Sequence, residues 1–414
     1  MTRRSKQPLR TDFKPGPIAW ARRRVLPLLA KGTALLGLLI LAAWIAGRVL
    51  TDQHHWSQYL WWLPPIWAIG AAWVLLIVSA LCTALARRLG GLLLRPLLLI
   101  AALGCSIYLV IGVWHTHRVL GGHGDKQPDT VRVLHWNQAA QKIDQAAWGD
   151  RIQDLGADIV LIANADWGES RQTLLEQFAY FAPTENRRWV NYSYRIHADP
   201  AHYRVEGAAM IASRYPMTRT GMVSFGSSER QPVLEHSASG SGWVMFAEFD
   251  LDPERADDEP LIVWLVDLPS DPGRWKRALM AEVRSAIDSW DGTGWAMGRH
   301  VWEQQTWENA SFPQPDLVIG DFNTPRGSGS LETLAPGYTD AFEQAGFGRG
   351  RSWMPPSRSA LMRRALTLAD WHIDLALTAP GVEATRYELI GTESGNHRVQ
   401  MVDISPRTSR TGSR

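Results

Sequence analysis

Three long apolar segments lie close together near the start of this 414-residue chain, and they limit its possible folds more than any other feature. They cover about residues 32–46, 60–84 and 97–114. A helix needs roughly 20 apolar residues to cross a bilayer, and core helices of soluble proteins rarely lack a polar face over that length. The two segments directly behind the first argue against a cleaved signal peptide. We therefore predict about three transmembrane helices within residues 31–115, after a basic cytoplasmic N-terminus at residues 1–30.

Basic side chains flank these segments unevenly. Arginines and lysines crowd the N-terminus, and Arg87, Arg88 and Arg95 lie between the second and third segments. Residues 51–56, between the first and second segments, contain neither type. The positive-inside rule then predicts an integral plasma-membrane or inner-membrane protein whose C-terminal part lies outside the cytoplasm. The only cysteines, Cys82 and Cys105, fall in the apolar segments, so the exported part would carry no thiol.

The rest of the chain has the pattern of a single globular domain. We expect a polar, glycine-containing linker at residues 116–130, a domain at residues 131–405 and a disordered tail at residues 406–414. Apolar runs typical of strands alternate with two stretches, at residues 139–155 and 274–290, whose apolar residues have helical spacing. The secondary structure of residues 295–312 is ambiguous. The net charge of +2, with its basic excess at the membrane end, argues against a strongly basic nucleic-acid surface.

One stretch of this domain combines a buried strand with reactive side chains. The apolar run at residues 317–319 ends at Gly320, and Asp321 and Asn323 then follow two positions apart, on the same side of the chain. A carboxylate there can take a proton from water, and the neighbouring carboxamide can hold a phosphate or metal-bound oxygen. An Asp/Asn-rich turn after a strand is an equally good interpretation of this stretch taken alone.

Gly320-Asp-Phe-Asn323 resembles the most recognisable motif of the endonuclease/exonuclease/phosphatase superfamily, and further family motifs follow in the expected order. They are Val131-Arg-Val-Leu-His-Trp-Asn137, Ala157-Asp-Ile-Val-Leu-Ile-Ala-Asn164, Gly207-Ala-Ala-Met-Ile-Ala-Ser-Arg214, Leu261-Ile-Val-Trp-Leu-Val-Asp267, Trp371-His-Ile-Asp374 and Ser394-Gly-Asn396-His397. The resemblance implies an α+β domain, a four-layer α/β/β/α sandwich of two packed mixed sheets.

The same resemblance implies hydrolysis of a phosphoester by water, assisted by a divalent metal. Asp321 would be the base, Asn323 would hold the phosphate, and Asp374 would orient His397, which would donate to the scissile phosphate. Asn137 and Asn396 would contact phosphate or substrate. Taken alone, His397 is better explained as an ordinary surface or core histidine, and it is the Asp374 motif before it that favours the site.

Three positions depart from the family pattern. Asn164 stands where the family has its metal-ligating Glu, Asp267 where it has the His of His-Leu, and Asn396 where it has the Asp of Ser-Asp-His. An amide oxygen can bind Mg²⁺ but brings no negative charge. A relocated metal site of Asn164, Asp267 and Asp166 is one interpretation, with Mg²⁺ as the expected ion and Mn²⁺ or Ca²⁺ as alternatives. A degenerate site is the other.

Two functions follow as alternatives. One is a membrane-anchored phosphodiesterase or nuclease acting on phospholipid headgroups, other envelope phosphoesters or nucleic acid. The other is an inactive binding or scaffolding domain. A local excess of arginines predicts a loop that recruits an anionic substrate at the site mouth, although a solvated loop or one resting on lipid headgroups fits equally well. These arginines are Arg349, Arg351, Arg358, Arg363 and Arg364. The oligomeric state is left open.

Overall fold

The computed structural model describes two compact units, one of residues 1–45 and 66–109 and one of residues 46–65 and 110–414. Within these ranges the described residues are 20, 24–86, 93–122, 126–139, 145–165, 200–226, 241–252, 259–299, 301–355, 359–392 and 396–406. Most of the basic N-terminus, Arg87, Arg88 and nearly all of the predicted tail therefore lie outside the described residues.

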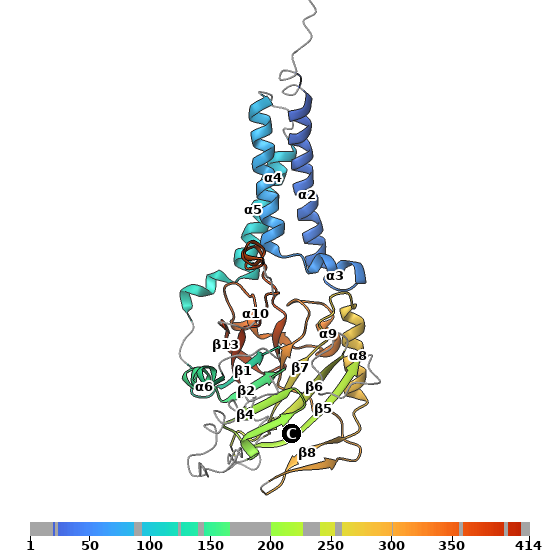
Figure 1. Ribbon diagram of the computed structural model, residues 1–414, viewed down its shortest axis with the longest axis vertical. Coiled ribbons are helices and arrows are strands. Elements are labelled where there is room, and N and C mark those ends of the chain that lie inside the picture. The colour runs from blue at the N-terminus through green and yellow to red at the C-terminus, as the bar shows by residue number, and fades with distance from the viewer. Residues whose placement is uncertain are drawn as a thin grey trace, which may run out of the picture. The chain divides into compact units, whose positions relative to one another are not determined.

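The first unit consists of three apolar helices (Figure 1). They are α2 (Leu26–Leu50), α4 (Pro65–Ala86) and α5 (Leu94–Tyr108), and a π-helical turn at Leu109–Val113 extends the third. The shortest continuous helix has 20 residues, and at about 1.5 Å per residue it matches a hydrocarbon core about 30 Å thick. The prediction of three helices long and apolar enough to cross a membrane is confirmed.

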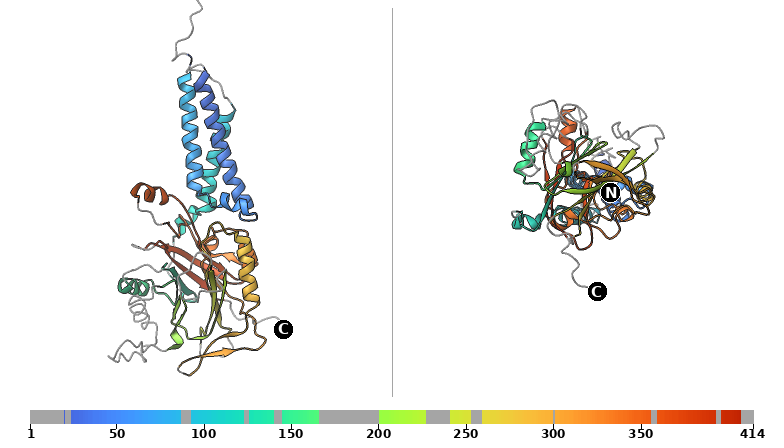
Figure 2. Two further views of the ribbon diagram at one scale, coloured as in Figure 1. Left: turned by 45° about the vertical axis from the view of Figure 1, so that its right-hand side comes forward. Right: turned by 90° about the horizontal axis from the view of Figure 1, so that it is seen from below.

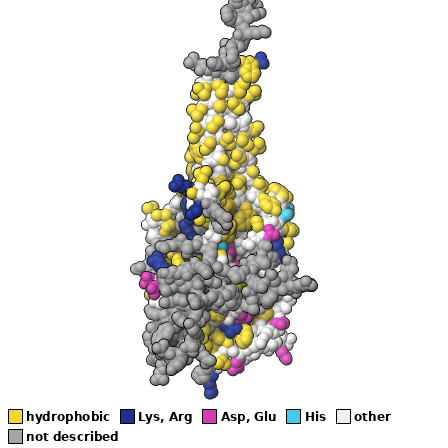
Figure 3. Space-filling model, viewed as in Figure 1, with side chains coloured by type: hydrophobic (Ala, Val, Ile, Leu, Met, Phe, Trp, Pro, Cys, Tyr) yellow, Lys and Arg dark blue, Asp and Glu magenta, His cyan; other side chains and the backbone are white. Residues whose placement is uncertain are grey.

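These helices pack through small residues and show apolar side chains on their outer surfaces. Ala34, Ala72 and Ala102 are fully buried, as is typical of close helix contacts in membranes. The Ser79 hydroxyl donates to the Ala30 carbonyl at 2.7 Å. The outward-facing surface of the helices is mostly hydrophobic in Figure 3. An exposed apolar surface of this extent is stable in lipid and unfavourable in water.

The second unit contains two mixed sheets. The six-stranded sheet has the order β13-β14-β1-β2-β4-β3. Its strands are β1 (Val131–Asn137), β2 (Ile159–Ala163), β3 (Tyr203–Glu206), β4 (Ala209–Ser213), β13 (Glu383–Ile390) and β14 (Val399–Ser405). The eight-stranded sheet has the order β11-β12-β10-β7-β6-β5-β8-β9. Its strands are β5 (Met217–Gly226), β6 (Ser241–Phe249), β7 (Leu261–Asp267), β8 (Thr293–Met297), β9 (Trp302–Thr306), β10 (Leu317–Asp321), β11 (Thr339–Asp340) and β12 (Asp374–Thr378).

Helices cover the outer faces of both sheets. The α-helices described in this unit are α3 (His55–Trp61), α6 (Gln145–Asp154), α8 (Lys276–Asp288), α9 (Leu331–Leu334), α10 (Ala341–Ala345) and α11 (Ala360–Leu366), of which α6, α8 and α9 cover these faces. Helix α8 buries Leu279, Val283 and Ile287 against the eight-stranded sheet. Ile152 of α6 packs on the six-stranded sheet, and Figures 1 and 2 show α6 and α8 on opposite sides of the sandwich. The predicted α/β/β/α architecture is confirmed.

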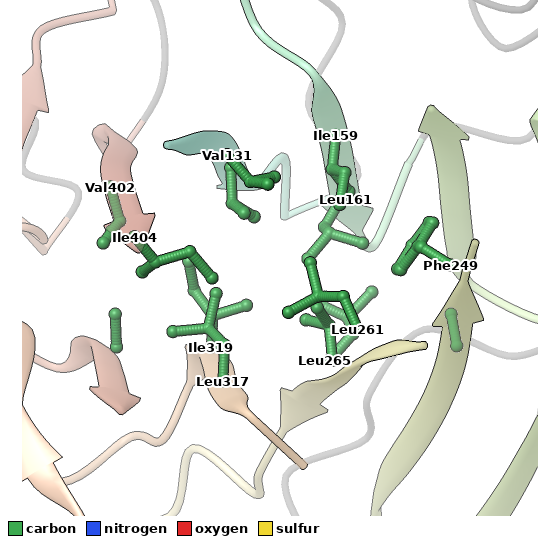
Figure 4. Close-up of a cluster of buried hydrophobic side chains, with 14 of the residues drawn as sticks. Val131, Ile159, Leu161, Phe249, Leu261, Leu265, Leu317, Ile319, Val402 and Ile404 are labelled. Carbon is green, nitrogen blue, oxygen red and sulfur yellow. The ribbon is translucent and has the colours of Figure 1, made fainter. Parts of the chain in front are cut away.

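The largest core lies between the sheets, where apolar residues alternate along the strands. Figure 4 shows Val131, Ile159 and Leu161 of the six-stranded sheet near Leu265 and Ile319 of the other. These five side chains are at most 3% exposed. At about 25 cal/mol per Å² of buried apolar surface, this layer is the main source of stability that holds the strand ends in register.

The ambiguous stretch at residues 295–312 contributes to a hairpin. Strands β8 and β9 pair antiparallel, from Thr293 opposite Thr306 to Met297 opposite Trp302. Four residues of β9, Glu303, Gln304, Gln305 and Thr306, are exposed. The hairpin lies at the edge of its sheet, where one face of a strand can be polar.

Residues 51–64, which join α2 to α4 and which we call the inter-span segment, belong to the same unit as the sandwich. Asp52 is 1% exposed, and its carboxylate accepts hydrogen bonds from the backbone N–H of Ser330, at 3.0 Å, and from the Ser330 hydroxyl. Gln58 is fully buried, donates to the carbonyls of Pro272 and Arg274, and accepts from the N–H of Lys276 at 3.1 Å. The segment is thus built into the loops that follow β7 and β10.

Candidate functional site

The sheet topology gathers the motif residues at one edge of the sandwich. Strands β7 and β10 are parallel neighbours, so Asp267 and Asp321 lie opposite one another at their carboxyl ends. Strand β12 runs antiparallel to β10, which places its first residue, Asp374, opposite Asp321. In the other sheet, Asn137 ends β1 beside the end of its parallel neighbour β2. Asp374 begins a strand and His397 lies just before one. Asn137, Asp267 and Asp321, in contrast, are each the last residue of a strand.

Backbone conformation at two positions explains the residue types there. A Cβ on Gly320 would lie 2.0 Å from the Val266 carbonyl oxygen, so only glycine allows this approach of β10 to β7. Asn323 has a φ of 46° and Asn164 a φ of 52°, in the left-handed region that asparagine tolerates better than most residues. These turns direct the chain away from the sheets directly after the two strands.

His397 and Asp374 form a buried pair. The His397 Nδ1 lies 3.0 Å from each carboxylate oxygen of Asp374. The Ser352 hydroxyl accepts hydrogen bonds from the N–H groups of Ile373 and Asp374, both at 3.0 Å, and fixes the start of β12. Because the carboxylate holds Nδ1–H, the Nε2 of the ring is directed to the remainder of the site.

Asp321 lies on the other side of this imidazole. Its Oδ2 accepts a hydrogen bond from Asn137 Nδ2 at 2.8 Å and is 3.9 Å from His397 Nε2. Its Oδ1 accepts from the N–H of Asn323 at 2.9 Å. The Asn323 amide donates in turn to the Leu268 carbonyl at 2.7 Å, which ties the loop after β10 to the loop after β7.

Asn164 connects the acids through its amide nitrogen. Asn164 Nδ2 lies 3.1 Å from Asp267 Oδ2 and 3.2 Å from Asn137 Oδ1. A continuous network therefore runs from Asp267 through Asn164 and Asn137 to Asp321. Asp267, which departs from the family pattern, is adjacent to Asn164, which departs from it as well.

Burial dominates the electrostatics of this cluster. Burial raises the pKa of Asp321 to about 8, and the neighbouring charge of Asp374 adds to that shift. Burial likewise raises the pKa of Asp267 to about 7, although the hydrogen bond from Asn164 opposes this. For His397, burial lowers the pKa, but the carboxylates, Asp374 first, outweigh it and raise the pKa to about 9. Three buried acids thus face one imidazole.

This surplus of acid fits a divalent cation. Asp321, Asp374 and His397 each offer a ligand atom, and these atoms lie within 4.8 Å of one another. Asp267 Oδ2 and Asn137 Oδ1, which both accept from the Asn164 amide nitrogen, add two more oxygens on one side. Oxygen-rich sets of this kind suit Mg²⁺, Mn²⁺ or Ca²⁺. A cation here would lower the free-energy cost of ionising the buried acids.

The described contacts place neither Asp166 nor the Asn396 side chain in this network. Asp166 lies outside the described residues. Asn396 adjoins His397, and its backbone carbonyl accepts from the N–H of Met354 at 3.0 Å. The described contacts of Asn396 include no side-chain hydrogen bond to the acids.

The predicted arginine loop divides into two parts. Arg349 pairs with Asp370 at 2.7 Å, and Arg351 donates to the Thr367 carbonyl at 3.0 Å. Arg363 and Arg364 are exposed on α11, and Arg358 lies outside the described residues. The first two arginines are thus engaged within the loop itself.

A buried polar chain behind the site was not foreseen from the sequence. Gln400 Nε2 is 2.8 Å from His135 Nδ1, and Tyr387 Oη donates to Gln400 Oε1 at 2.8 Å. His372 Nε2 lies 2.8 Å from the same hydroxyl. Burial lowers the pKa of His135 to about 4, which keeps this ring neutral. The signal was present, because His135 precedes Asn137 by two positions on one strand and so faces the same side.

Comparison with solved structures finds similar chains at low sequence identity. An endonuclease/exonuclease/phosphatase from Beutenbergia cavernae DSM 12333 is 15% identical, with a TM-score of 0.39, over 67% of this chain and 71% of that one. A functionally unknown conserved protein from Enterococcus faecalis V583 is 10% identical, with a TM-score of 0.43, over 66% and 99%. TDP2 from C. elegans is 13% identical, with a TM-score of 0.39, over 73% and 84%.

Among curated proteins, no sequence matches this chain. A family model, in contrast, matches residues 134–399, which span the strands and loops that carry the whole acid network. With its two mixed sheets and the motif residues at one sheet edge, the chain belongs to the endonuclease/exonuclease/phosphatase family.

Proposed function

We propose that this protein is a membrane-anchored, metal-dependent phosphoesterase whose catalytic domain lies outside the cytoplasm. The observation that carries the proposal is the position of Asp321 opposite the His397–Asp374 pair, with Asp321 Oδ2 3.9 Å from His397 Nε2. A base and a hydrogen-bond donor this close together can act on the same side of one phosphate, the base on the attacking water and the donor on a phosphate oxygen beside it.

The residues have complementary roles in this proposal. Asp321, when ionised, takes a proton from a water molecule as the water oxygen forms a bond to phosphorus. His397 Nε2–H donates a hydrogen bond to a phosphate oxygen on the same side, and the bond from phosphorus to the leaving oxygen breaks on the opposite side, where the leaving oxygen takes a proton from solvent water. Asp374 holds Nδ1 and keeps the imidazolium charged, which agrees with the raised pKa of His397. Asn137 orients the Asp321 carboxylate through its 2.8 Å hydrogen bond.

Asp267, Asn164 and Asn137 are proposed to hold the divalent cation through their oxygens, beside Asp321. When bound, such a cation neutralises negative charge on the phosphate. Asp267 supplies the negative charge that the family's Glu would bring, from β7 of the other sheet. Asp166 and Asn396 stay as predicted contributors to metal and substrate binding, respectively.

A second candidate function, a catalytically inactive binding or scaffolding domain, is supported by one specific contact. Asn164 Nδ2 donates to Asp267 and Asn137 at once, so this amide holds their oxygens together in place of a cation. Such a site would still attract a phosphate to His397 without activating water.

The outward orientation is supported by the basic residues of the N-terminus and the absence of Lys and Arg from residues 51–56. Candidate substrates are the phosphoesters of lipid headgroups, other envelope phosphoesters and nucleic acid.

The deciding experiment measures phosphodiester hydrolysis by the whole chain in detergent, over a series of Mg²⁺, Mn²⁺ and Ca²⁺ concentrations. The parent should turn over with at least one ion, Asp321→Ala should be inactive, and Asp129→Ala, at an exposed aspartate before β1, should match the parent. A parent that neither binds a divalent ion nor hydrolyses any phosphoester class establishes the inactive domain instead.

A further inference from the structure

Helix α11 presents apolar side chains to the outside of the catalytic unit. Leu361 is 80% exposed, Met362 52% and Leu368, just after the helix, 45%. Arg363 and Arg364 are exposed beside them. A short helix gains little stability from its own hydrogen bonds. Exposing three large apolar side chains to water would therefore destabilise it with nothing to offset the loss. Apolar residues next to arginines are typical of elements that lie in a membrane surface.

The segment after α11 is tied to the residues next to the apolar helices. The Trp371 indole donates to the Trp62 carbonyl at 3.1 Å, three residues before α4 begins. The Trp114 indole, one residue after the third apolar helix ends, donates to the Asp370 carboxylate at 3.0 Å. The three tryptophans line one cavity together with Pro65 and Val113. Contacts within the catalytic unit alone therefore hold α11 close to the level at which the chain leaves the bilayer.

The other exposed apolar residues of this unit have a similar location. Among the described residues, most of them lie at the end of α2, in the inter-span segment, or at the end of the third apolar helix and directly after it. They are Val49, Trp56, Tyr59, Val110, Ile111, Val119 and Leu120. Trp275 is bonded to this region through the Asp52 carbonyl, at 3.0 Å. Val301, in the β8–β9 hairpin, is the exception. This distribution identifies lipid, and not a protein partner, as the occupant of the surface that includes α11.

The chain leading to α11 also borders the candidate site. Trp353 forms a β-bridge with His397, and the preceding Ser352 holds the N–H of Asp374. Residues 351–355 therefore connect the His397–Asp374 pair to the membrane-facing helix, with only residues 356–358 outside the described part of this connection. The rim of the site and α11 are parts of one short stretch of chain.

We propose that α11 lies in the bilayer surface and makes the site selective for a phosphoester carried on a membrane-lipid headgroup. Leu361 and Met362 enter the acyl boundary, and Arg363 and Arg364 remain at the level of the lipid phosphates. This substrate class rests on the proposed phosphoesterase function, whereas the location of α11 does not. A soluble nucleic acid or a free phosphate ester would gain nothing from such a rim.

The location is tested with the whole chain in vesicles of phosphatidylglycerol and phosphatidylcholine. Cys82 and Cys105 are replaced by Ala, and one cysteine is introduced by Leu361→Cys or, as the matched control, by Val301→Cys at an exposed valine of the hairpin. An environment-sensitive fluorophore on position 361 should be quenched by nitroxide-bearing lipid and protected from aqueous iodide. The fluorophore on position 301 should show the reverse. Equal iodide quenching at both positions overturns the proposal.

The selectivity is tested with the double variant Leu361→Asp/Met362→Asp. Hydrolysis of a lipid-borne phosphodiester in vesicles should fall about tenfold or more, because the rim no longer enters the bilayer, while hydrolysis of a water-soluble diester is unchanged. Val301→Asp should alter neither rate. An equal loss on both substrates, or no loss on either, contradicts the lipid selectivity. A parent that hydrolyses nothing refutes the phosphoesterase function. The quenching experiment still tests the location of α11, because it does not depend on activity.

Discussion

The His397 imidazole places its Nδ1 at the same distance, 3.0 Å, from both carboxylate oxygens of Asp374, so the acid holds the ring from one side only. Asp374→Asn would keep the shape but lose the charge that keeps the ring protonated. We expect kcat/KM to fall about 10²- to 10⁴-fold, the range for a lost acid–base partner. Steady-state kinetics on the whole chain measures it, with Asp129→Asn as the control. A loss below threefold would remove His397 from the proposed chemistry.

The pH dependence of turnover should follow the acids of the site. Asp321 acts in its ionised form, and burial raises its pKa to about 8, so activity should rise with pH through that region. Activity should fall again near pH 9, where His397 loses its proton. These limbs belong to the coupled pair and not to either residue alone.

A divalent cation next to Asp321 favours the ionised carboxylate and lowers its pKa. The acidic limb should therefore move to lower pH as the metal concentration is raised. Complete pH–rate profiles at two metal concentrations check this. An acidic limb that does not move places the cation away from Asp321.

Asp267→Asn removes a negative charge beside Asn164 without a large change in volume. Because a strongly hydrated cation binds less tightly to neutral oxygens, the metal concentration for half-maximal activity should rise about 10- to 100-fold. The maximal rate at saturating metal should change less. A variant with an unchanged metal requirement would contradict the role of Asp267 as a ligand.

Asp52→Ala tests the attachment of the inter-span segment. The substitution leaves the buried N–H of Ser330 without its acceptor, and we expect the free energy of unfolding to fall by about 1–3 kcal/mol. Gln53→Ala, at an exposed neighbour, is the control and should have no effect. Denaturation of the detergent-solubilised chain, followed by tryptophan fluorescence, measures both variants.

The orientation has its own test. A reporter that is active only outside the cytoplasm should be active when fused after Arg414, and a cytoplasm-only reporter should be silent there. Activity of the cytoplasmic reporter would mean that the orientation or the number of crossings is wrong.

Most of the strands could be predicted from local patterns in the sequence. The apolar runs at β1, β2, β7 and β10 are short, buried and closed by polar residues, so their strand character follows from the sequence. Residues 295–312 were ambiguous because the edge strand β9 is polar and lacks the alternation that a half-buried strand shows. The strand pairing rested on the family resemblance, since no local rule sets β10 between β7 and β12.

The sequence predicts which residues belong to the candidate site better than it predicts the contacts between them. Asp321, Asp374 and His397 follow from motifs, but their distances depend on two sheets meeting at one edge. The donation from Asn164 to Asp267 could not be read from the sequence, because 103 residues separate them. His135 escaped notice because its partner, Gln400, lies 265 residues away.

The contact between Asp52 and Ser330 has a consequence for how the protein is made. The two residues are 278 positions apart, so the ribosome completes one long before the other. A domain that begins at residue 125 lacks the hydrogen bonds of Asp52 and Gln58, because both residues belong to an earlier part of the chain. We therefore expect this domain to reach its full stability only when residues 51–64 are already in place beside it. Proteolytic removal of the apolar helices together with this segment would leave a domain that unfolds more readily than the whole chain.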